Sequence, residues 1–213
     1  AGIFLLLRLK RKGIIFHFKD YLKPFSYLEQ TQKYILYMLV LLGFGLFVMN
    51  CIQPVFDYDS LAYHLPSMAN WYQSGWLSPN GQTVNTQIGC YPYNWELICT
   101  MFMFPFGEDF MMLFPNILVW IQLGLAIYLI TVKLGVERLY GLLAAALVCL
   151  LPIVVSGLNK ISTDIPLVSF FLAGLYFITC FKRKPSFYFF FMGLASIAML
   201  PGIKTSGILY GII

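Results

Sequence analysis

The sequence predicts an all-α fold: a polytopic bundle of transmembrane helices with a long first external loop that carries short interfacial helices. Hydrophobic residues fill 60% of the 213 positions and charged residues only 11%, whereas about a quarter of a soluble domain is charged. One soluble core cannot bury so much apolar surface, so lipid must be the solvent for much of the chain. We expect one transmembrane region over 1–213, cut from the N-terminal part of a longer chain, because both ends lie in apolar runs.

Four apolar runs approach the roughly 20 residues that a helix needs to cross about 30 Å of hydrocarbon. They cover residues 34–53, 110–131, 139–157 and 165–181. A fifth run, 187–203, contains Pro201-Gly202 and ends at Lys204. The run 97–106 is too short to cross and predicts an interfacial or re-entrant helix.

Basic residues predict the orientation of these spans, because they concentrate on the cytoplasmic side of membrane proteins. Placing 8–33, 132–138 and 182–185 in the cytoplasm puts every lysine and arginine there except Lys160, which falls outside, and Lys204, which stays undecided. The acids that fall outside are Asp57, Asp59, Glu96, Glu108, Asp109 and Asp164. Since the basic residues form short clusters between apolar runs, no nucleic-acid partner is expected.

The external loop 54–109 is rich in tryptophan and tyrosine, which favour the membrane–water boundary. Apolar residues recur in it at helical spacing: Leu61, Leu65, Met68 and Tyr72. Gly75 is a natural helix end, and Pro66 must lie in the first turn or kink the helix. We therefore expect a short helix on the membrane surface.

Two aspartates open this loop in the stretch FDYDSLAYHL. Asp59 is either the N-cap of the helix that follows or a catalytic carboxylate. Asp57 and Asp59 also form Asp-x-Asp. In an extended segment both side chains point the same way, as a divalent cation such as Mg²⁺ or Mn²⁺ requires. For Asp57 alone, a solvated loop acid is the simpler interpretation.

Three further residues of the loop are candidates. Tyr63 and His64 are candidate substrate-binding residues, although a lone interfacial histidine is more often a polar anchor. Glu96 is either the first-turn acid of a helix, favoured by the helix dipole, or a second catalytic carboxylate facing the same compartment as Asp59.

Asp164 lies in the stretch NKISTDIP between two spans. Any of residues 162–164 can cap a helix with Pro166 in its first turn. The predicted topology also places Asp164 on the same side as Asp59, so the two carboxylates can define one site. Lys160 can pair with Asp164 or bind a phosphate.

Lys204 interrupts the last apolar run directly after Pro201-Gly202. An ionisable residue at membrane depth marks a functional site by default, and a broken helix at that depth is tolerated where it lines a cavity. The alternative is that the Lys204 side chain extends to the outer interface.

The five cysteines show no metal-binding spacing such as CxxC. Cys99, Cys149 and Cys180 lie in apolar runs, where cysteine is a small buried hydrophobe. Cys51 and Cys90 can pair if their loop faces an oxidising compartment, and spacing alone leaves this open.

Short motifs follow one another in a fixed order. They are Asp59-Ser60-Leu61-Ala62-Tyr63-His64-Leu65-Pro66, Gly75-Trp76-Leu77-x-Pro79, Tyr91-Pro92-x-x-x-Glu96-Leu97, Thr163-Asp164-x-Pro166-Leu167 and Gly202-Ile203-Lys204-Thr205. In this order and topology, over roughly 34–210, the chain resembles the GT-C superfamily of membrane glycosyltransferases. The resemblance is to the bacterial branch similar to protein O-mannosyltransferases and aminoarabinose transferases.

The resemblance implies an inverting transferase in the plasma membrane, with a polyprenyl-phosphate-linked sugar donor, an outward-facing active site and a lipid, glycan or protein acceptor. It implies that Asp59 is the general base, that Asp164 is the later loop acid and that Lys204 contacts the lipid phosphate. Many relatives carry a second acid directly after the first. Here that position is Ser60, and Glu96 is expected to compensate.

The residues themselves suit this chemistry. Sugar transfer needs a base on the acceptor and a positive charge on the leaving phosphate, which Lys204, Lys160 or a divalent cation can supply. No GxGxxG or Walker loop occurs, as expected for a lipid-borne donor. The alternative function is a lipid-linked sugar flippase or transporter without transferase activity. It predicts more charge buried mid-span than Lys204 alone, so we favour the enzyme.

Overall fold

The computed structural model describes residues 29–77 and 91–212, and within these ranges the chain forms helices and no strand. The helices are α3 (Gln30–Ile52), η1 (Ser60–His64), α4 (Leu65–Ser74), α5 (Asn94–Met101), α6 (Phe114–Lys133), α7 (Arg138–Cys149), α8 (Pro152–Leu158), α9 (Asp164–Arg183), α10 (Phe187–Ile203) and α11 (Gly207–Ile212). The predicted all-α membrane bundle is confirmed. The predicted cytoplasmic residues 8–28, Pro79 and Cys90 lie outside the described residues, so the Cys51–Cys90 pairing stays open.

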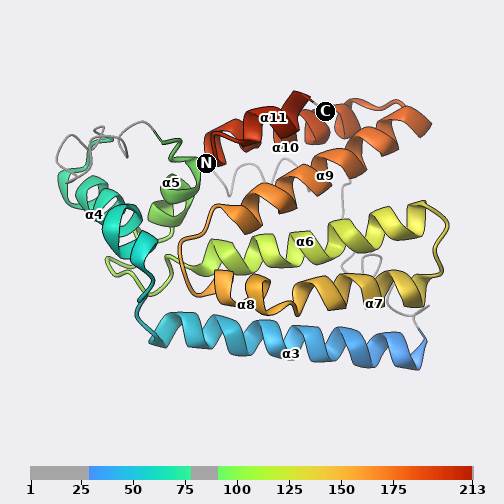
Figure 1. Ribbon diagram of the computed structural model, residues 1–213, viewed down its shortest axis with the longest axis horizontal. Helices are drawn as coiled ribbons and strands as arrows, with labels where there is room; N and C mark the ends of the chain where they lie inside the picture. Colours follow the sequence, from blue (N-terminus) through green and yellow to red (C-terminus); the bar gives the residue numbers. More distant parts are fainter. Residues whose placement is uncertain (1–28, 78–90, 213) are drawn as a thin grey trace, which may run out of the picture.

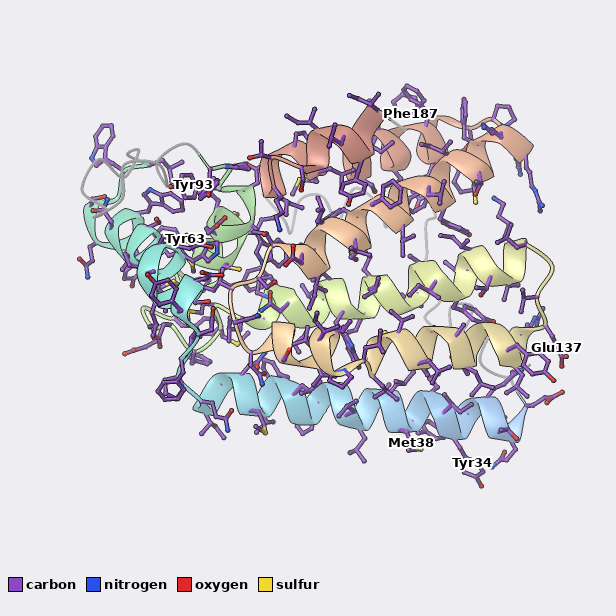
Figure 2. All side chains as sticks on the ribbon, in the orientation of Figure 1. Tyr34, Met38, Tyr63, Tyr93, Glu137 and Phe187 are labelled. Atoms are coloured by element: carbon purple, nitrogen blue, oxygen red, sulfur yellow. The ribbon has the colours of Figure 1, made fainter. Side chains whose placement is uncertain are left out.

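The long helices form a bundle whose outer surface is apolar. In Figure 1, α3, α6 and α7 lie side by side, and α9 and α10 continue the bundle on the other side of α6. Helices α3, α6 and α9 are each long and apolar enough to cross a membrane. Tyr34 and Met38 point away from the bundle in Figure 2 and are 59% and 72% exposed. Such a surface is stable only in lipid.

The span predicted at 139–157 is a broken helix rather than a straight one. Helices α7 and α8 meet at an angle of 61° across Leu150 and Leu151. Pro152 is the first residue of α8. It has no N–H to donate back to α7, and it disfavours the helical conformation in Leu151, so the bend occurs there.

The predicted surface helix is present as η1 followed by α4. It ends at Gly75, whose φ of 69° lies in the left-handed region that glycine adopts without strain. Pro66 lies in the first turn of α4, as required. Of the apolar positions at helical spacing, Met68 is fully buried and Leu65 and Tyr72 pack against the core, whereas Leu61 is 51% exposed. The polar residues Ser60, His64 and Ser67 are buried as well. The buried face of this helix therefore combines apolar and polar side chains.

The run 97–106 does not cross the bundle, as predicted. Its helical part is α5, with eight residues, and turns follow up to the start of α6. Eight residues span only about 12 Å, too little for the hydrocarbon layer.

The two ends of the bundle carry different groups. Tyr63 and Tyr93 lie at one end in Figure 2 and Glu137 at the other. At the Glu137 end, Arg183 donates to the carbonyl oxygen of Lys133 at 3.4 Å, which brings two predicted cytoplasmic loops together. The other end contains the predicted external loop, the α8–α9 connection and Lys204, so Lys204 lies at the same end of the bundle as that loop.

Candidate active site

A cavity of about 320 Å³ lies at the Tyr63 end of the bundle. Within the described ranges, four stretches of the chain meet there: η1 with the residues before it, the start of α5, the α8–α9 connection and the break between α10 and α11. The cavity is lined by every site residue that the sequence predicted: Asp57, Asp59, Tyr63, His64, Glu96, Lys160, Asp164 and Lys204. Packing of the helices thus joins residues that are up to about 150 positions apart in the chain.

Asp57, and not Asp59, caps the first helix of the site. The backbone N–H of Ser60 donates to Oδ2 of Asp57 at 3.0 Å. Asp59 precedes η1 but makes no capping hydrogen bond, and its side chain is exposed to the cavity. The interpretation of Asp57 as a solvated loop acid was therefore wrong, because its carboxylate is partly buried and hydrogen-bonded.

The expected geometry of the Asp-x-Asp motif was also wrong. Asp59 has φ −64° and ψ −44°, which is helical and not extended, because the helix begins before η1. One Asp57 oxygen is already held by Ser60, although the other is buried without a hydrogen-bond partner in the described structure. Among the described residues, no group of three or more histidine, cysteine, aspartate or glutamate side chains is arranged to hold a metal ion. These residues fit a divalent cation poorly, and the metal stays a prediction.

His64 and Glu96 form a buried pair on the wall of the cavity. His64 Nδ1 lies 2.5 Å from Glu96 Oε1, and the two side chains are 8% and 2% exposed. The other Glu96 oxygen, Oε2, is buried and has no hydrogen-bond partner among the described residues. A buried carboxylate oxygen strongly favours a hydrogen-bond donor. Because Glu96 lines the cavity, a hydroxyl group of a bound molecule can donate a hydrogen bond to its carboxylate.

Tyr63 lies beside this pair, with its ring centroid 4.1 Å from that of His64. Burial, followed by the negative charge of Asp59, raises the pKa of Tyr63 to about 12. Both effects disfavour the phenolate. The Tyr63 hydroxyl thus remains a hydrogen-bond donor at physiological pH.

Asp164 and Lys204 form an ion pair at the cavity. The Nζ atom of Lys204 donates to Oδ1 of Asp164 at 2.5 Å, and the side chains are 44% and 71% exposed. Helix α9 begins at Asp164 with Pro166 in its first turn, as predicted. Asp164 thus pairs with Lys204 and not with Lys160. An exposed pair is worth little net energy, so a ligand can replace one partner.

Lys160 lines the same cavity and has no ion-pair partner among the described residues. Its backbone is held from inside the protein by residues that sequence reasoning missed. Asn116 donates to the carbonyl oxygens of Leu158 and Lys160, and Ser60 accepts from the N–H of Ile161. The sequence feature that could have identified these residues is a polar residue in or next to an apolar run, as Asn116 is. Tyr91, Thr205 and Ser206 also line the cavity and were not predicted individually.

Comparison with known protein families gives one match for this chain. The family model described as dolichyl-phosphate-mannose-protein mannosyltransferase matches residues 67–210, which is more than half of the chain. The match includes Glu96, Lys160, Asp164 and Lys204, and begins just after His64. Comparisons with curated proteins and with solved structures give no significant match.

Proposed function

The chain belongs to the dolichyl-phosphate-mannose-protein mannosyltransferase family, and on this premise we propose that its cavity transfers a sugar from a polyprenyl-phosphate donor to an acceptor hydroxyl. The family makes it a membrane glycosyltransferase of the GT-C superfamily. The observation that carries the proposal is the cavity itself, which collects carboxylates and lysines at one end of an apolar bundle. A lipid-borne phosphate ester reaches such a site from the bilayer without a nucleotide-binding loop.

We assign the general base to Asp59. Its carboxylate is exposed to the cavity and makes no capping hydrogen bond. In the proposed step the acceptor oxygen attacks the anomeric carbon and gives its proton to Asp59. The bond from that carbon to the phosphate oxygen breaks, and the electron pair leaves with the phosphate. One displacement of this kind inverts the anomeric centre, and a positioned base contributes about 10²–10⁴-fold in rate.

We propose that Lys160 and Lys204 face the leaving phosphate. Both line the cavity, and positive charge that faces a leaving phosphate stabilises the transition state. Asp164, which the sequence also predicted as catalytic, is proposed to orient Lys204 through their ion pair. A divalent cation at Asp57 and Asp59 is kept as a prediction, and no step here depends on it.

Glu96, His64 and Tyr63 are proposed to bind the hydroxyl groups of the sugar or the acceptor. Glu96 Oε2 is a buried acceptor without a partner in the described residues, and Tyr63 retains its proton. Carbohydrates present several hydroxyl groups that both donate and accept hydrogen bonds. The acceptor itself, whether lipid, glycan or protein, belongs to the outer face of the bacterial plasma membrane in this proposal.

The distribution of buried charge supports a transferase over a flippase or transporter. Among the buried polar side chains of the described residues, the ionisable ones are Glu96 and His64, and both lie at the cavity end. A path for ions or charged substrates across the bilayer is expected to have ionisable groups near the middle of the spans. In the described spans the buried side chains there are neutral, such as Ser169 and Ser196.

Replacing Asp59, the assigned general base, tests the proposed function. D59N in the full-length protein should lower sugar transfer from polyprenyl-phosphate donors at least about a hundredfold, because an amide cannot take the proton. The control is D109N, the same substitution on an exposed acid of the same loop that does not line the cavity. Membrane insertion of both variants is measured alongside. Transfer by D59N at the level of D109N would remove Asp59 from the mechanism and direct the search to Glu96 and Asp164.

A further inference from the structure

We propose that Asn116 is a positioning residue of this enzyme: it holds the 158–163 segment from inside the bundle so that Lys160 faces the donor phosphate. This inference deepens the proposed function and rests on it. Asn116 belongs to α6, and it does not line the cavity. It therefore acts through Lys160.

The side-chain amide of Asn116 binds two carbonyl groups on either side of one residue. Its Nδ2 atom donates to the carbonyl oxygen of Leu158 at 3.0 Å and to that of Lys160 at 2.9 Å. The nitrogen of the asparagine side-chain amide carries two hydrogens, so it can donate both hydrogen bonds at the same time. Asn116 is 2% exposed, which leaves little water to replace it.

Two more buried side chains hold the same segment. Asn50 of α3, 7% exposed, donates to the carbonyl oxygen of Leu158 at 3.1 Å. Ser60 of η1, fully buried, accepts from the N–H of Ile161 at 2.9 Å. The segment is thus tied to α3, α6 and η1, and the last of these directly follows Asp59.

The position of the segment explains why these bonds matter. Helix α8 has seven residues and ends at Leu158, so its last carbonyl groups have no partner within the helix. In a membrane bundle such groups must find partners inside the protein. The Leu158 and Ile161 side chains, 0% and 1% exposed, are packed in the core on both sides of Lys160.

Lys160 consequently has a backbone that is fixed at the wall of the cavity. A reacting group displaced by about 1 Å can cost a hundredfold in rate, so precision of this backbone affects function and not only stability. A purely structural asparagine would weaken the fold without a specific effect on Lys160. A double-mutant cycle separates the two cases.

The experiment measures the dissociation constant of a polyprenyl monophosphate for the full-length protein in detergent. The variants are N116A, K160M and the double variant N116A/K160M. The matched control is S169A, because Ser169 is also fully buried and donates between α9 and α6 at 3.0 Å, away from the cavity. S60A removes a second side-chain hydrogen bond to the same segment. It replaces N116A in the experiment if N116A does not insert into the membrane.

We expect K160M to weaken binding about tenfold, and N116A to weaken it about tenfold in the wild-type background but less than about threefold in K160M. S60A should behave as N116A does, and S169A should bind as the wild type does. Equal losses for N116A in both backgrounds, or an equal loss for S169A, would overturn the inference.

The two proposals fail in different ways. If K160M weakens binding but N116A and S60A do not, Asn116 has no positioning role and the proposed function stands. If the wild type binds no polyprenyl monophosphate, both proposals are wrong.

Discussion

Neighbouring carboxylates of this site have different environments. Asp57 is hydrogen-bonded to the helix backbone, Asp59 is exposed at the cavity and makes no capping hydrogen bond, and Asp164 is paired with Lys204. Glu96 is buried with His64. A carboxylate can act as a base only if its oxygens are free to meet the substrate. At the residue scale, this distinction is what singles out Asp59.

The raised pKa of Tyr63 predicts how stability depends on pH. Burial, and then Asp59, raises its pKa from 10.0 to about 12. Because the folded state favours the protonated phenol, this contribution to stability is complete below about pH 10 and is lost as the pH rises toward 12. The phenolate absorbance that disappears in Y63F should therefore titrate near pH 12 in the folded protein.

The same titration in D59N measures how much the negative charge of Asp59 raises the pKa of Tyr63. Removing the Asp59 charge should lower the Tyr63 pKa, while burial keeps it above 10.0. A Tyr63 midpoint near pH 10 in the folded wild type would contradict the burial of this phenol beside the acids.

At the scale of elements, α5 and α10 are in unusually close contact. A Cβ atom added to Gly202 would overlap the side chain of Asn94, the first residue of α5. Glu96 follows two residues later on α5, and Lys204 follows two residues after Gly202. The absence of a side chain at 202 therefore sets the distance between two walls of the cavity.

G202A tests this contact. We expect a loss of roughly 1–3 kcal/mol in stability, because overpacking forces neighbours to shift. Sugar transfer should fall as well, because α5 must move away from α10. Thermal unfolding in detergent and a transfer assay measure the two effects.

G45A is the control for the same substitution in a transmembrane helix. A Cβ at Gly45 meets nothing within 4 Å, and alanine favours the helix. This variant should unfold at the wild-type temperature or slightly above it. Similar behaviour of G202A and G45A would mean that α5 adjusts without cost.

At the scale of the whole molecule, the apolar outer surface and the polar end divide the protein between lipid and water. Exposed apolar side chains cover α3, among them Tyr37, Met38 and Leu41. The cavity lies at one end of the bundle, and the Lys133, Glu137 and Arg183 loops lie at the other. This arrangement follows from the cost of placing charge within hydrocarbon.

The orientation of the bundle can be measured by labelling. In a variant without native cysteines, W76C and L134C make a matched pair, because both positions are 78% exposed and lie at opposite ends. A membrane-impermeant maleimide should label W76C on intact cells and L134C only after permeabilisation. The reverse pattern would place the cavity in the cytoplasm and refute the outward-facing site.

The sequence by itself determined the helical membrane class, the positions of the spans and the loops that carry chemical groups. These properties depend on local composition and on the distribution of charge. The break at Pro152 also has a local cause, yet Pro152 was not used in predicting 139–157 as a complete span.

Only the tertiary structure decided which groups meet. His64 pairs with Glu96 over 32 positions, Lys204 with Asp164 over 40, and Ser60 reaches Ile161 over 101. The helical spacing predicted the surface helix, but not that Ser60 of η1 is buried against the 158–163 segment while Leu61 is exposed. Such contacts depend on how helices pack, and packing brings together residues whose local sequences contain no information about each other.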